Sequence, residues 1–268
     1  MQAQQIFDRL WAGYTEQNPE ALSIFNLFIK KGETVANDHI AFRTFNDPRI
    51  NIDVLAKPFL TAGYVYKDSY KFEDKHLFAR HYEHPDMPDA PRVFISELIS
   101  EDFSYEVQSA ITCLADKIPT TLPDSEELLF SGNTWGTPSY ERYQKLRTES
   151  EYAAWVYVYG FRANHFTVSI NSLKKYETIE KVNKLLKDSG FLLNDAGGEI
   201  KGTPAELLDQ SSTRAGILPV TFQEGVFEIP SCYYEFARRY PDSSGKLYSG
   251  FIAKSADKIF ESTDFYKK

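Results

Sequence analysis

Two short segments of the chain share one alternation of apolar and polar positions. They span residues 37–43 and 163–169, and each carries one histidine at the same place, His39 in the first and His165 in the second. Successive side chains of a β-strand point to opposite faces, so each segment predicts a strand with an apolar back. The front presents the histidine among small or polar residues, with Arg43 at the end of the first strand. The two strands are therefore predicted to line one polar cavity.

The stretch that follows each histidine is also repeated. Residues 52–60 and 176–186 both have the pattern of a helix. Each is followed by a glycine, the residue best suited to the left-handed turn that ends many helices. This glycine lies 24 residues after the histidine in the first copy (Gly63) and 25 residues after it in the second (Gly190). The near-equal spacing indicates an internal repeat.

Each copy then continues through strand-like segments and closes on an apolar strand with a single glutamate. The first closing strand holds Glu97 and the second holds Glu235. One copy is thus predicted to contain a strand with a histidine, a helix, and several strands of which the last carries a glutamate. The predicted single domain comprises a helical flank at 1–35, a first module at 36–99, a helical insertion at 100–160, and a second module with a C-terminal helix at 161–268.

Composition and charge narrow the range of partners. The 268 residues are 42% hydrophobic and 25% charged, as in an ordinary globular protein. The net charge of -8 argues against a nucleic-acid partner. No apolar stretch is long enough to cross a membrane, and the first residues lack the pattern of a signal peptide. We therefore expect a cytoplasmic protein that acts on a small molecule, with neither a membrane nor a nucleic acid as partner.

Four segments, 37–45, 164–167, 198–202 and 207–213, carry a family resemblance. Together with the repeat, they make the chain resemble the vicinal oxygen chelate superfamily, in which paired βαβββ modules form a cupped mixed sheet around a metal. Within that superfamily, the chain is similar to the 2-oxoadipate dioxygenase/decarboxylase family. The resemblance implies an α+β fold of this kind, with a helical N-terminal flank and a helical insertion.

The resemblance also implies a metal bound by His39, His165 and one carboxylate from the last strand of the second module. Two histidines and a carboxylate with open positions are the ligand set that suits ferrous iron in oxygenases. Glu235 is the favoured carboxylate because it occupies the place of Glu97 in the repeat, and Glu228 is its rival. Glu97 is a candidate for a fourth ligand.

Arg43 adds an argument about the substrate. Four residues along a strand correspond to ~13 Å, so a gap separates the metal from the guanidinium on the same face. That gap suits a dicarboxylic 2-oxo acid, whose distal carboxylate could accept two hydrogen bonds from the arginine. Ser211, Ser212 and Thr213 are candidate hydroxyl donors to the substrate, and Arg214 is a further candidate. The resemblance implies that 2-oxoadipate and dioxygen give 2-hydroxyglutarate and carbon dioxide, with Fe(2+) as the cofactor.

Other functions remain open at this point. A non-redox lyase, isomerase or hydrolase on the same scaffold would use nickel or zinc, and a metal contact by Glu97 would favour it. A metal-free binding protein is a third hypothesis, and an intact set of two histidines and a glutamate argues against it. His76, His81 and His84 also form a dense group of donors, which is predicted to be a solvated edge or a gate for the substrate.

Overall fold

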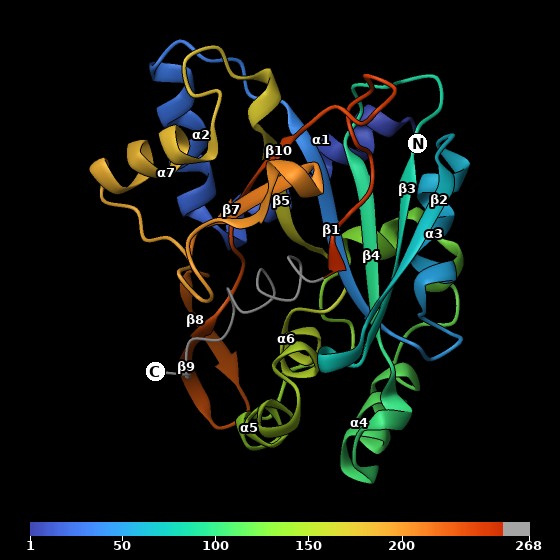
Figure 1. Ribbon diagram of the computed structural model, residues 1–268. Coiled ribbons are helices and arrows are strands. Elements are labelled where there is room, and N and C mark those ends of the chain that lie inside the picture. The colour runs from blue at the N-terminus through green and yellow to red at the C-terminus, as the bar shows by residue number, and fades with distance from the viewer. Residues whose placement is uncertain (254–268) are drawn as a thin grey trace.

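The structure is a computed structural model of the chain and describes residues 1–253. Its centre is an eight-stranded sheet that curves into a cup, with helices packed around it (Figure 1). The strands are β1 (Asn37–Phe45), β2 (Val65–Phe72), β3 (Leu77–Glu83), β4 (Arg92–Leu98), β5 (Ala163–Ser169), β6 (Lys201–Thr203), β7 (Leu208–Ser212), β8 (Ile217–Phe222), β9 (Gly225–Pro230) and β10 (Glu235–Arg239). The helices in the described residues are α1 (Ala3–Gln17), α2 (Pro19–Lys30), α3 (Ile52–Thr61), α4 (Tyr105–Ala115), α5 (Tyr140–Glu149), α6 (Glu151–Tyr159) and α7 (Ile179–Asp188).

The sheet consists of two halves that repeat one βαβββ unit. Its strand order is β2-β3-β4-β1-β5-β10-β7-β6, so β1 to β4 form one half and β5, β6, β7 and β10 form the other. In each half the first strand pairs in parallel with the last, and the two first strands pair with each other in antiparallel fashion. The predicted α+β fold with a cupped mixed sheet is confirmed. A hairpin of β8 and β9 forms a separate sheet between β7 and β10 in the chain.

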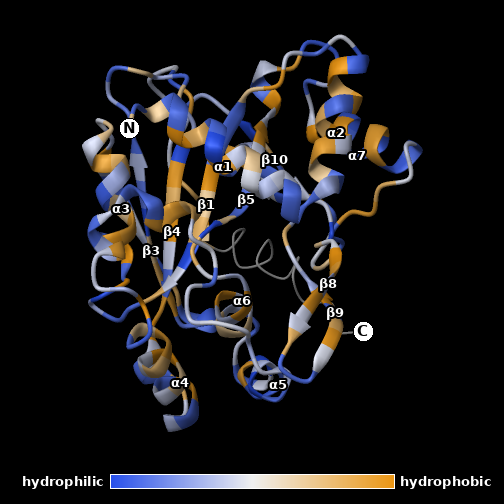
Figure 2. Ribbon diagram, turned by 180° about the vertical axis from the view of Figure 1, so that it is seen from behind, coloured by the Kyte–Doolittle hydropathy of each residue, from blue (hydrophilic) through white to orange (hydrophobic). Residues whose placement is uncertain are grey.

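The outer face of the cup is apolar and covered by helices. Figure 2 shows hydrophobic stretches along the central strands and in the helices around them. The ring of Phe166 on β5 lies 5.1 Å from that of Trp11 on α1, and Phe236 on β10 lies 6.2 Å from Phe28 on α2. Burial of one such side chain stabilises the fold by about 1.5–3 kcal/mol. The fully buried residues of the outer face include Ile40, Phe42, Phe166, Val168 and Phe236.

The helical segment between the two halves reaches the inner side of the cup. On α6, the Tyr152 hydroxyl accepts a hydrogen bond from Thr44 N at 3.0 Å and donates one to Ser96 O at 2.7 Å. Trp155 Nε1, one turn along, donates to Ser231 O at 2.8 Å. Thr44 and Ser96 belong to the first half, whereas Ser231 leads into β10 of the second. Helix α6 therefore connects the two halves on the inner side of the cup.

The repeat is confirmed at the helix ends but not at the glutamates. Gly63 and Gly190 follow α3 and α7 with φ of 98° and 88°, in the left-handed region that glycine tolerates. On the last strand of the second half, Glu235 lies opposite Thr167, two positions after His165. In the first half, the residue opposite Ala41, two positions after His39, is Phe94. Glu97 comes three residues later, and an odd offset turns a strand side chain to the other face, so its alignment with Glu235 was wrong.

Two expectations concern the C-terminal helix and membrane-spanning helices. The C-terminal helix predicted for the second module lies outside the described residues, which end at 253. Within residues 1–253, no helix combines the length and the apolar character needed to cross a membrane. The N-terminal helices α1 and α2 pack on the outer face of the sheet, where Trp11 and Phe28 contact it.

Candidate metal centre and substrate site

Three buried side chains from adjacent strands meet on the inner face of the cup. They are His39 on β1, His165 on β5 and Glu235 on β10, and their ligand atoms lie within 4.8 Å of one another. The strand register brings them together, because Thr167 on β5 lies opposite both His39 and Glu235. His39 Nε2 is 3.5 Å from Glu235 Oε1, and His165 Nε2 is 3.3 Å from Glu235 Oε2. The carboxylate thus presents one oxygen to each imidazole.

The residue before each histidine fixes the orientation of its ring. The pairing of β1 with β5 is irregular at Asp38 and at Asn164, and each is the extra residue of a bulge. A bulge redirects side chains relative to a regular strand. Asp38 Oδ1 accepts a hydrogen bond from His39 Nδ1 at 2.8 Å, and Asn164 Oδ1 accepts one from His165 Nδ1 at 3.1 Å. Both rings therefore keep a proton on Nδ1 and direct the lone pair of Nε2 to the centre of the cluster.

Burial sets the protonation of the cluster. It lowers the pKa of His39 and lowers that of His165 well below its usual value, so both imidazoles are neutral. It raises the pKa of Glu235 to about 8, although a hydrogen bond donated by Gln210 Nε2 opposes the shift. Burial also opposes the charge of Asp38, but Arg239 and His39 outweigh it and hold the pKa of Asp38 well below its usual value.

This donor set fits a divalent metal. Metal binding requires neutral imidazoles and a carboxylate that releases its proton, and both conditions can be met here. Two histidines and one carboxylate leave several positions for a substrate and for dioxygen, which is the arrangement typical of ferrous iron oxygenases. His39, His165 and Glu235 could therefore hold a metal ion.

The two other glutamates considered as ligands lie elsewhere. Glu97 Oε2 accepts a hydrogen bond from Ile52 N at 2.9 Å, at the beginning of α3 on the outer face. Glu228 is exposed in the hairpin of β8 and β9, opposite Pro219. Neither belongs to the cluster. The idea of Glu97 as a fourth ligand was wrong, and so was that of Glu228 as the rival of Glu235.

Arg43 lies on the same face of β1 as His39. Its side chain is buried, and its guanidinium carbon lies 5.1 Å from the ring centre of Tyr152 and 5.3 Å from that of Trp155, both on α6. The positive charge of Arg43 also lowers the pKa of His165, in addition to the effect of burial. The arginine is therefore packed against aromatic rings on the side of the sheet that carries the cluster.

Tyr233 is a site residue that the sequence pattern did not reveal. Its ring stacks on that of His165, with centres 4.7 Å apart and planes at 28°. Burial raises the pKa of the Tyr233 phenol, and the positive charge of Arg43 only partly offsets this, so the hydroxyl stays protonated. Tyr233 stands two residues before Glu235 in the chain. That spacing is the signal by which it could have been found, since residues two apart on an extended segment share a face.

The predicted hydroxyl donors fall into different environments. Ser212 lies opposite Glu235 in the pairing of β7 with β10 and so faces the cluster. The Ser211 hydroxyl donates to Asn183 Oδ1 of α7 on the outer face, at 2.6 Å. Thr213 Oγ1 accepts from a backbone N–H at 3.0 Å, and Arg214 is an exposed partner of an aspartate. The structure thus brings Ser212 to the site but not Ser211, Thr213 or Arg214.

Phe251 packs on the cluster, and His81 packs on Phe251. The ring of Phe251 lies 4.8 Å from that of His39, nearly perpendicular to it, and 5.3 Å from that of His81. His81 is buried and bonds the Tyr70 hydroxyl at 2.9 Å, so it is not part of a solvated edge. His76, by contrast, is exposed and pairs with Asp102. Of the dense group of histidines, only His81 lies beside the site.

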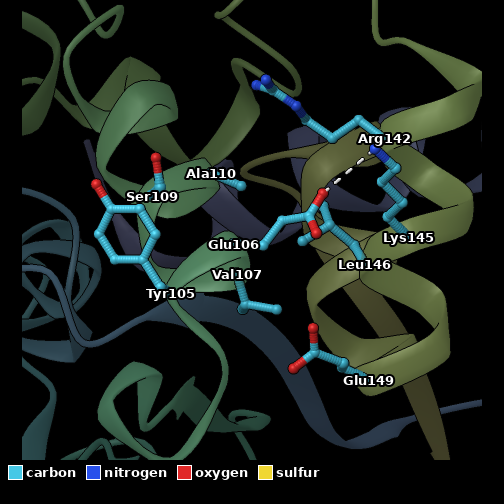
Figure 3. A pocket seen from close by; sticks show the side chains of 9 residues that line it. All are labelled: Tyr105, Glu106, Val107, Ser109, Ala110, Arg142, Lys145, Leu146 and Glu149. Carbon is cyan, nitrogen blue, oxygen red and sulfur yellow. Dashed lines mark ion pairs between the residues drawn. The ribbon is translucent and has the colours of Figure 1, made fainter.

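A surface hollow of about 240 Å³ between α4 and α5 does not include the cluster (Figure 3). Across the hollow, Lys145 Nζ of α5 lies 3.6 Å from Glu106 Oε1 of α4, and it also lies 3.1 Å from Glu141 Oε1 on its own helix; all three side chains are exposed. Exposed ion pairs of this kind are typical of a solvated surface. The hollow is lined by Tyr105, Glu106, Val107, Ser109, Ala110, Arg142, Lys145, Leu146 and Glu149.

Several known proteins are similar to this chain. A sequence profile of the 2-oxoadipate dioxygenase/decarboxylase family matches residues 6–122 and 127–246. A protein of Oryza sativa subsp. japonica named 2-oxoadipate dioxygenase/decarboxylase, chloroplastic/amyloplastic, is 37% identical and covers 93% of this chain and 75% of its own length. An Arabidopsis thaliana protein named 2-oxoadipate dioxygenase/decarboxylase, chloroplastic, is 36% identical over 93% of this chain and 74% of its own.

Solved structures agree with these matches. A putative hydrolase from Shewanella frigidimarina is 51% identical, with a TM-score of 0.89 over 94% of this chain and 98% of its own. Hydroxyglutarate synthase from Oryza sativa in complex with 2-oxoadipate is 35% identical, with a TM-score of 0.87 over 97% of this chain and 91% of its own. A putative glyoxalase superfamily protein from Ralstonia eutropha, 20% identical, has a TM-score of 0.75 over 93% and 85%. The last likeness concerns the fold alone.

These comparisons correct one expectation and decide the family. The expected cytoplasmic location is contradicted, because both plant relatives are named as plastid proteins. The family profile covers most of the chain, and the plant relatives are more than one third identical over nearly all of it. The chain belongs to the 2-oxoadipate dioxygenase/decarboxylase family.

Proposed function

We propose that this protein is a ferrous iron-dependent dioxygenase that decarboxylates a dicarboxylic 2-oxo acid. The proposed reaction converts 2-oxoadipate and dioxygen into 2-hydroxyglutarate and carbon dioxide. The observation that carries the proposal is the buried cluster of His39, His165 and Glu235 on the same face of the sheet as Arg43. Family membership and the likeness to a rice enzyme solved with 2-oxoadipate support it.

The three ligands have separate tasks in this proposal. His39 and His165 offer neutral Nε2 atoms whose directions are set by Asp38 and Asn164. Glu235 gives up its proton when a metal binds and supplies the one negative charge among the ligands. Bound ferrous iron would supply the redox chemistry between dioxygen and the 2-oxo acid.

Arg43 and Tyr233 are proposed to bind the distal carboxylate of the substrate. A guanidinium can donate two parallel hydrogen bonds to a carboxylate, and a neutral phenol can add a third. Both side chains are buried, so these bonds would form away from water, where they are strong. Ser212, opposite Glu235, is the hydroxyl donor that we retain from the predicted set.

Aromatic rings are proposed to keep water away from the reacting atoms. Phe251 packs against His39, Tyr233 stacks on His165, and Trp155 lies beside Arg43. A dry site strengthens the charge interactions of the substrate and limits side reactions. The same rings would favour a slim aliphatic chain between the two carboxylates.

Oxygen uptake by the metal-free protein after addition of ferrous iron tests this proposal. We expect rapid uptake with 2-oxoadipate and slow uptake with 2-oxohexanoate, which has the same length but a methyl group in place of the distal carboxylate. The His165→Ala variant should lose uptake with both acids. Equal uptake by the variant and the original protein would contradict the proposed ligand set.

The structure does not show the feature that would have favoured a non-redox metal enzyme. That feature was a metal contact by Glu97, which instead accepts a hydrogen bond from Ile52 N on the outer face. A lyase, isomerase or hydrolase would convert its substrate without consuming dioxygen. Activity that persists under nitrogen with nickel or zinc would favour this alternative.

A further inference from the structure

Asp38 connects His39 to Arg239 inside the cup. Its Oδ1 accepts a hydrogen bond from His39 Nδ1 at 2.8 Å. Its two oxygens also accept from Arg239, at 2.9 Å from Nη2 and 2.7 Å from Nε. The three side chains are at most 3% exposed. Two parallel bonds between an arginine and a carboxylate fix their relative geometry closely and are stronger than neutral hydrogen bonds.

This pair joins two strands that are not neighbours in the sheet. Asp38 belongs to β1 and Arg239 to β10, and β5 lies between them. The same two strands carry His39 and Glu235, while the strand that is bridged carries His165. The ion pair therefore holds the strands of the first and third ligands at a set distance across the strand of the second.

The second half of the sheet has no charged counterpart at the matching position. There the bulge residue is Asn164, whose neutral amide oxygen accepts from His165 Nδ1 at 3.1 Å. A carboxylate that accepts from Nδ1–H both orients an imidazole and makes it a more basic ligand, whereas an amide mainly orients it. The imidazole of His39 is thus expected to be a more basic ligand than that of His165.

Arg239 also holds the segment that packs on His39. Its Nη1 donates to Tyr248 O at 3.0 Å and to Gly250 O at 2.7 Å. The next residue, Phe251, places its ring 4.8 Å from that of His39. Only a guanidinium offers this many donors in a fixed plane, so lysine could not replace Arg239.

We propose that Asp38 and Arg239 are positioning residues of the metal centre. They fix the ring of His39, increase its strength as a ligand, and hold Phe251 against it. This inference rests on the proposed function, because it requires a metal at His39, His165 and Glu235. It adds to that function a reason why the two halves of a repeated fold differ beside their histidines.

Cobalt(II) binding to the metal-free protein tests the proposal without relying on turnover. We expect Asp38→Ala to raise the dissociation constant of Co(II) by about 10- to 100-fold, as for other residues that support metal ligands. Asp38→Asn, which copies the arrangement at Asn164, should raise it less but should shift the visible absorption of the bound ion. Arg239→Lys should weaken binding as well.

Asp209→Asn is the matched control. Asp209 is another buried aspartate of the same sheet, on β7, and its Oδ2 accepts a hydrogen bond from the Tyr240 hydroxyl at 2.8 Å. This variant should keep both the affinity for Co(II) and the absorption spectrum. Thermal unfolding of each metal-free variant shows which ones fold, and the spectrum of Asp38→Asn decides the question if Asp38→Ala does not fold.

The possible failures can be told apart. Unchanged Co(II) affinity and an unchanged spectrum in the Asp38 variants overturn the positioning role while leaving the proposed function intact. Failure of the original protein to bind Co(II), or equal binding after His165→Ala, overturns both. A change as large in Asp209→Asn as in Asp38→Asn would also contradict the proposal, because the effect would then belong to any buried charge of the sheet.

Discussion

The two histidines of the proposed metal centre are each oriented by the residue that precedes them in the chain. Asp38 and Asn164 are bulge residues, and both accept a hydrogen bond from the neighbouring Nδ1. This local arrangement directs both Nε2 atoms toward Glu235 before any metal binds. The site is therefore preorganised by short-range geometry, which reduces the ordering that metal binding requires.

Replacement of Arg43 should change the choice of substrate. We expect Arg43→Gln to lower kcat/KM for 2-oxoadipate by about 10- to 100-fold, since a hydrogen bond to a charged group contributes about 1.5–3 kcal/mol. The value for 2-oxohexanoate should change little. Steady-state oxygen uptake with both acids measures this, and an equal loss with both would show that Arg43 does not contact the distal carboxylate.

Removal of the Tyr233 hydroxyl should have a smaller effect of the same kind. Tyr233→Phe keeps the ring that stacks on His165 but loses one donor. We expect kcat/KM for 2-oxoadipate to fall about 10-fold, at the lower end of the range for a hydrogen bond to a charged group, because Arg43 remains to pair with the carboxylate. Metal affinity, measured by titration, should stay the same. A large loss of metal affinity would mean that the hydroxyl acts on His165 and not on the substrate.

Metal affinity should depend on pH through Glu235. In the metal-free protein, burial raises the pKa of Glu235 to about 8, so at lower pH a proton must leave before the carboxylate can bind a metal. Affinity should therefore rise about tenfold per pH unit between pH 6 and pH 8 and level off above that. Titrations with Co(II) across this range check the slope. Glu235→Gln should bind weakly and without this slope.

Residues whose side chains suit metal or carboxylate binding could be predicted from the sequence. Residues whose place depends on how the strands pair could not. His39, His165 and Arg43 follow from the alternation along two strands, and Glu235 from the closing strand. Tyr233 was missed because it lies before β10, in a segment without regular pairing. Glu97 was misplaced because it lies three residues beyond Phe94, the position that matches Glu235, and this odd offset turns its side chain to the outer face.

At the scale of elements, Glu97 has a structural role at the start of α3. It accepts from Ile52 N, while Asn51 accepts from Val54 N at 3.1 Å, so two of the free N–H groups of the helix are satisfied. We expect Glu97→Ala to lower the free energy of unfolding by about 1 kcal/mol, as for the loss of a helix cap. Chemical denaturation measures this loss.

The control for this prediction is metal binding. Glu97→Ala should bind Co(II) as the original protein does, and Glu228→Ala should change neither stability nor binding, because Glu228 is exposed in the hairpin. Weaker Co(II) binding by Glu97→Ala would mean that the first half contributes a carboxylate after all.

Strands and helices could be predicted where the pattern is regular, but their irregularities could not. The predicted strand at 163–169 coincides with β5, and the predicted helix at 176–186 overlaps α7. The bulges at Asp38 and Asn164 depend on how two strands pair, which involves contacts far apart in the chain. The hairpin of β8 and β9 could not be predicted from the repeat either, because it has no counterpart in the first copy.

At the scale of the whole molecule, each half contributes residues to both ends of the proposed site. The shared inner face carries the ligands where the halves meet, while Arg43 of the first half and Tyr233 beside the second lie together near α6. Helix α6 belongs to the segment between the halves and bonds to both. The two repeated halves thus form the cup, and the segment between them forms part of its wall beside Arg43.

The most direct test of the central claim follows the oxygen atoms. With ferrous iron, 2-oxoadipate and ¹⁸O-labelled dioxygen, mass spectrometry should find two labelled atoms in 2-hydroxyglutarate, one in the new hydroxyl and one in the new carboxylate, and none in the carbon dioxide. Substrate conversion that leaves the product unlabelled would contradict a dioxygenase reaction at His39, His165 and Glu235.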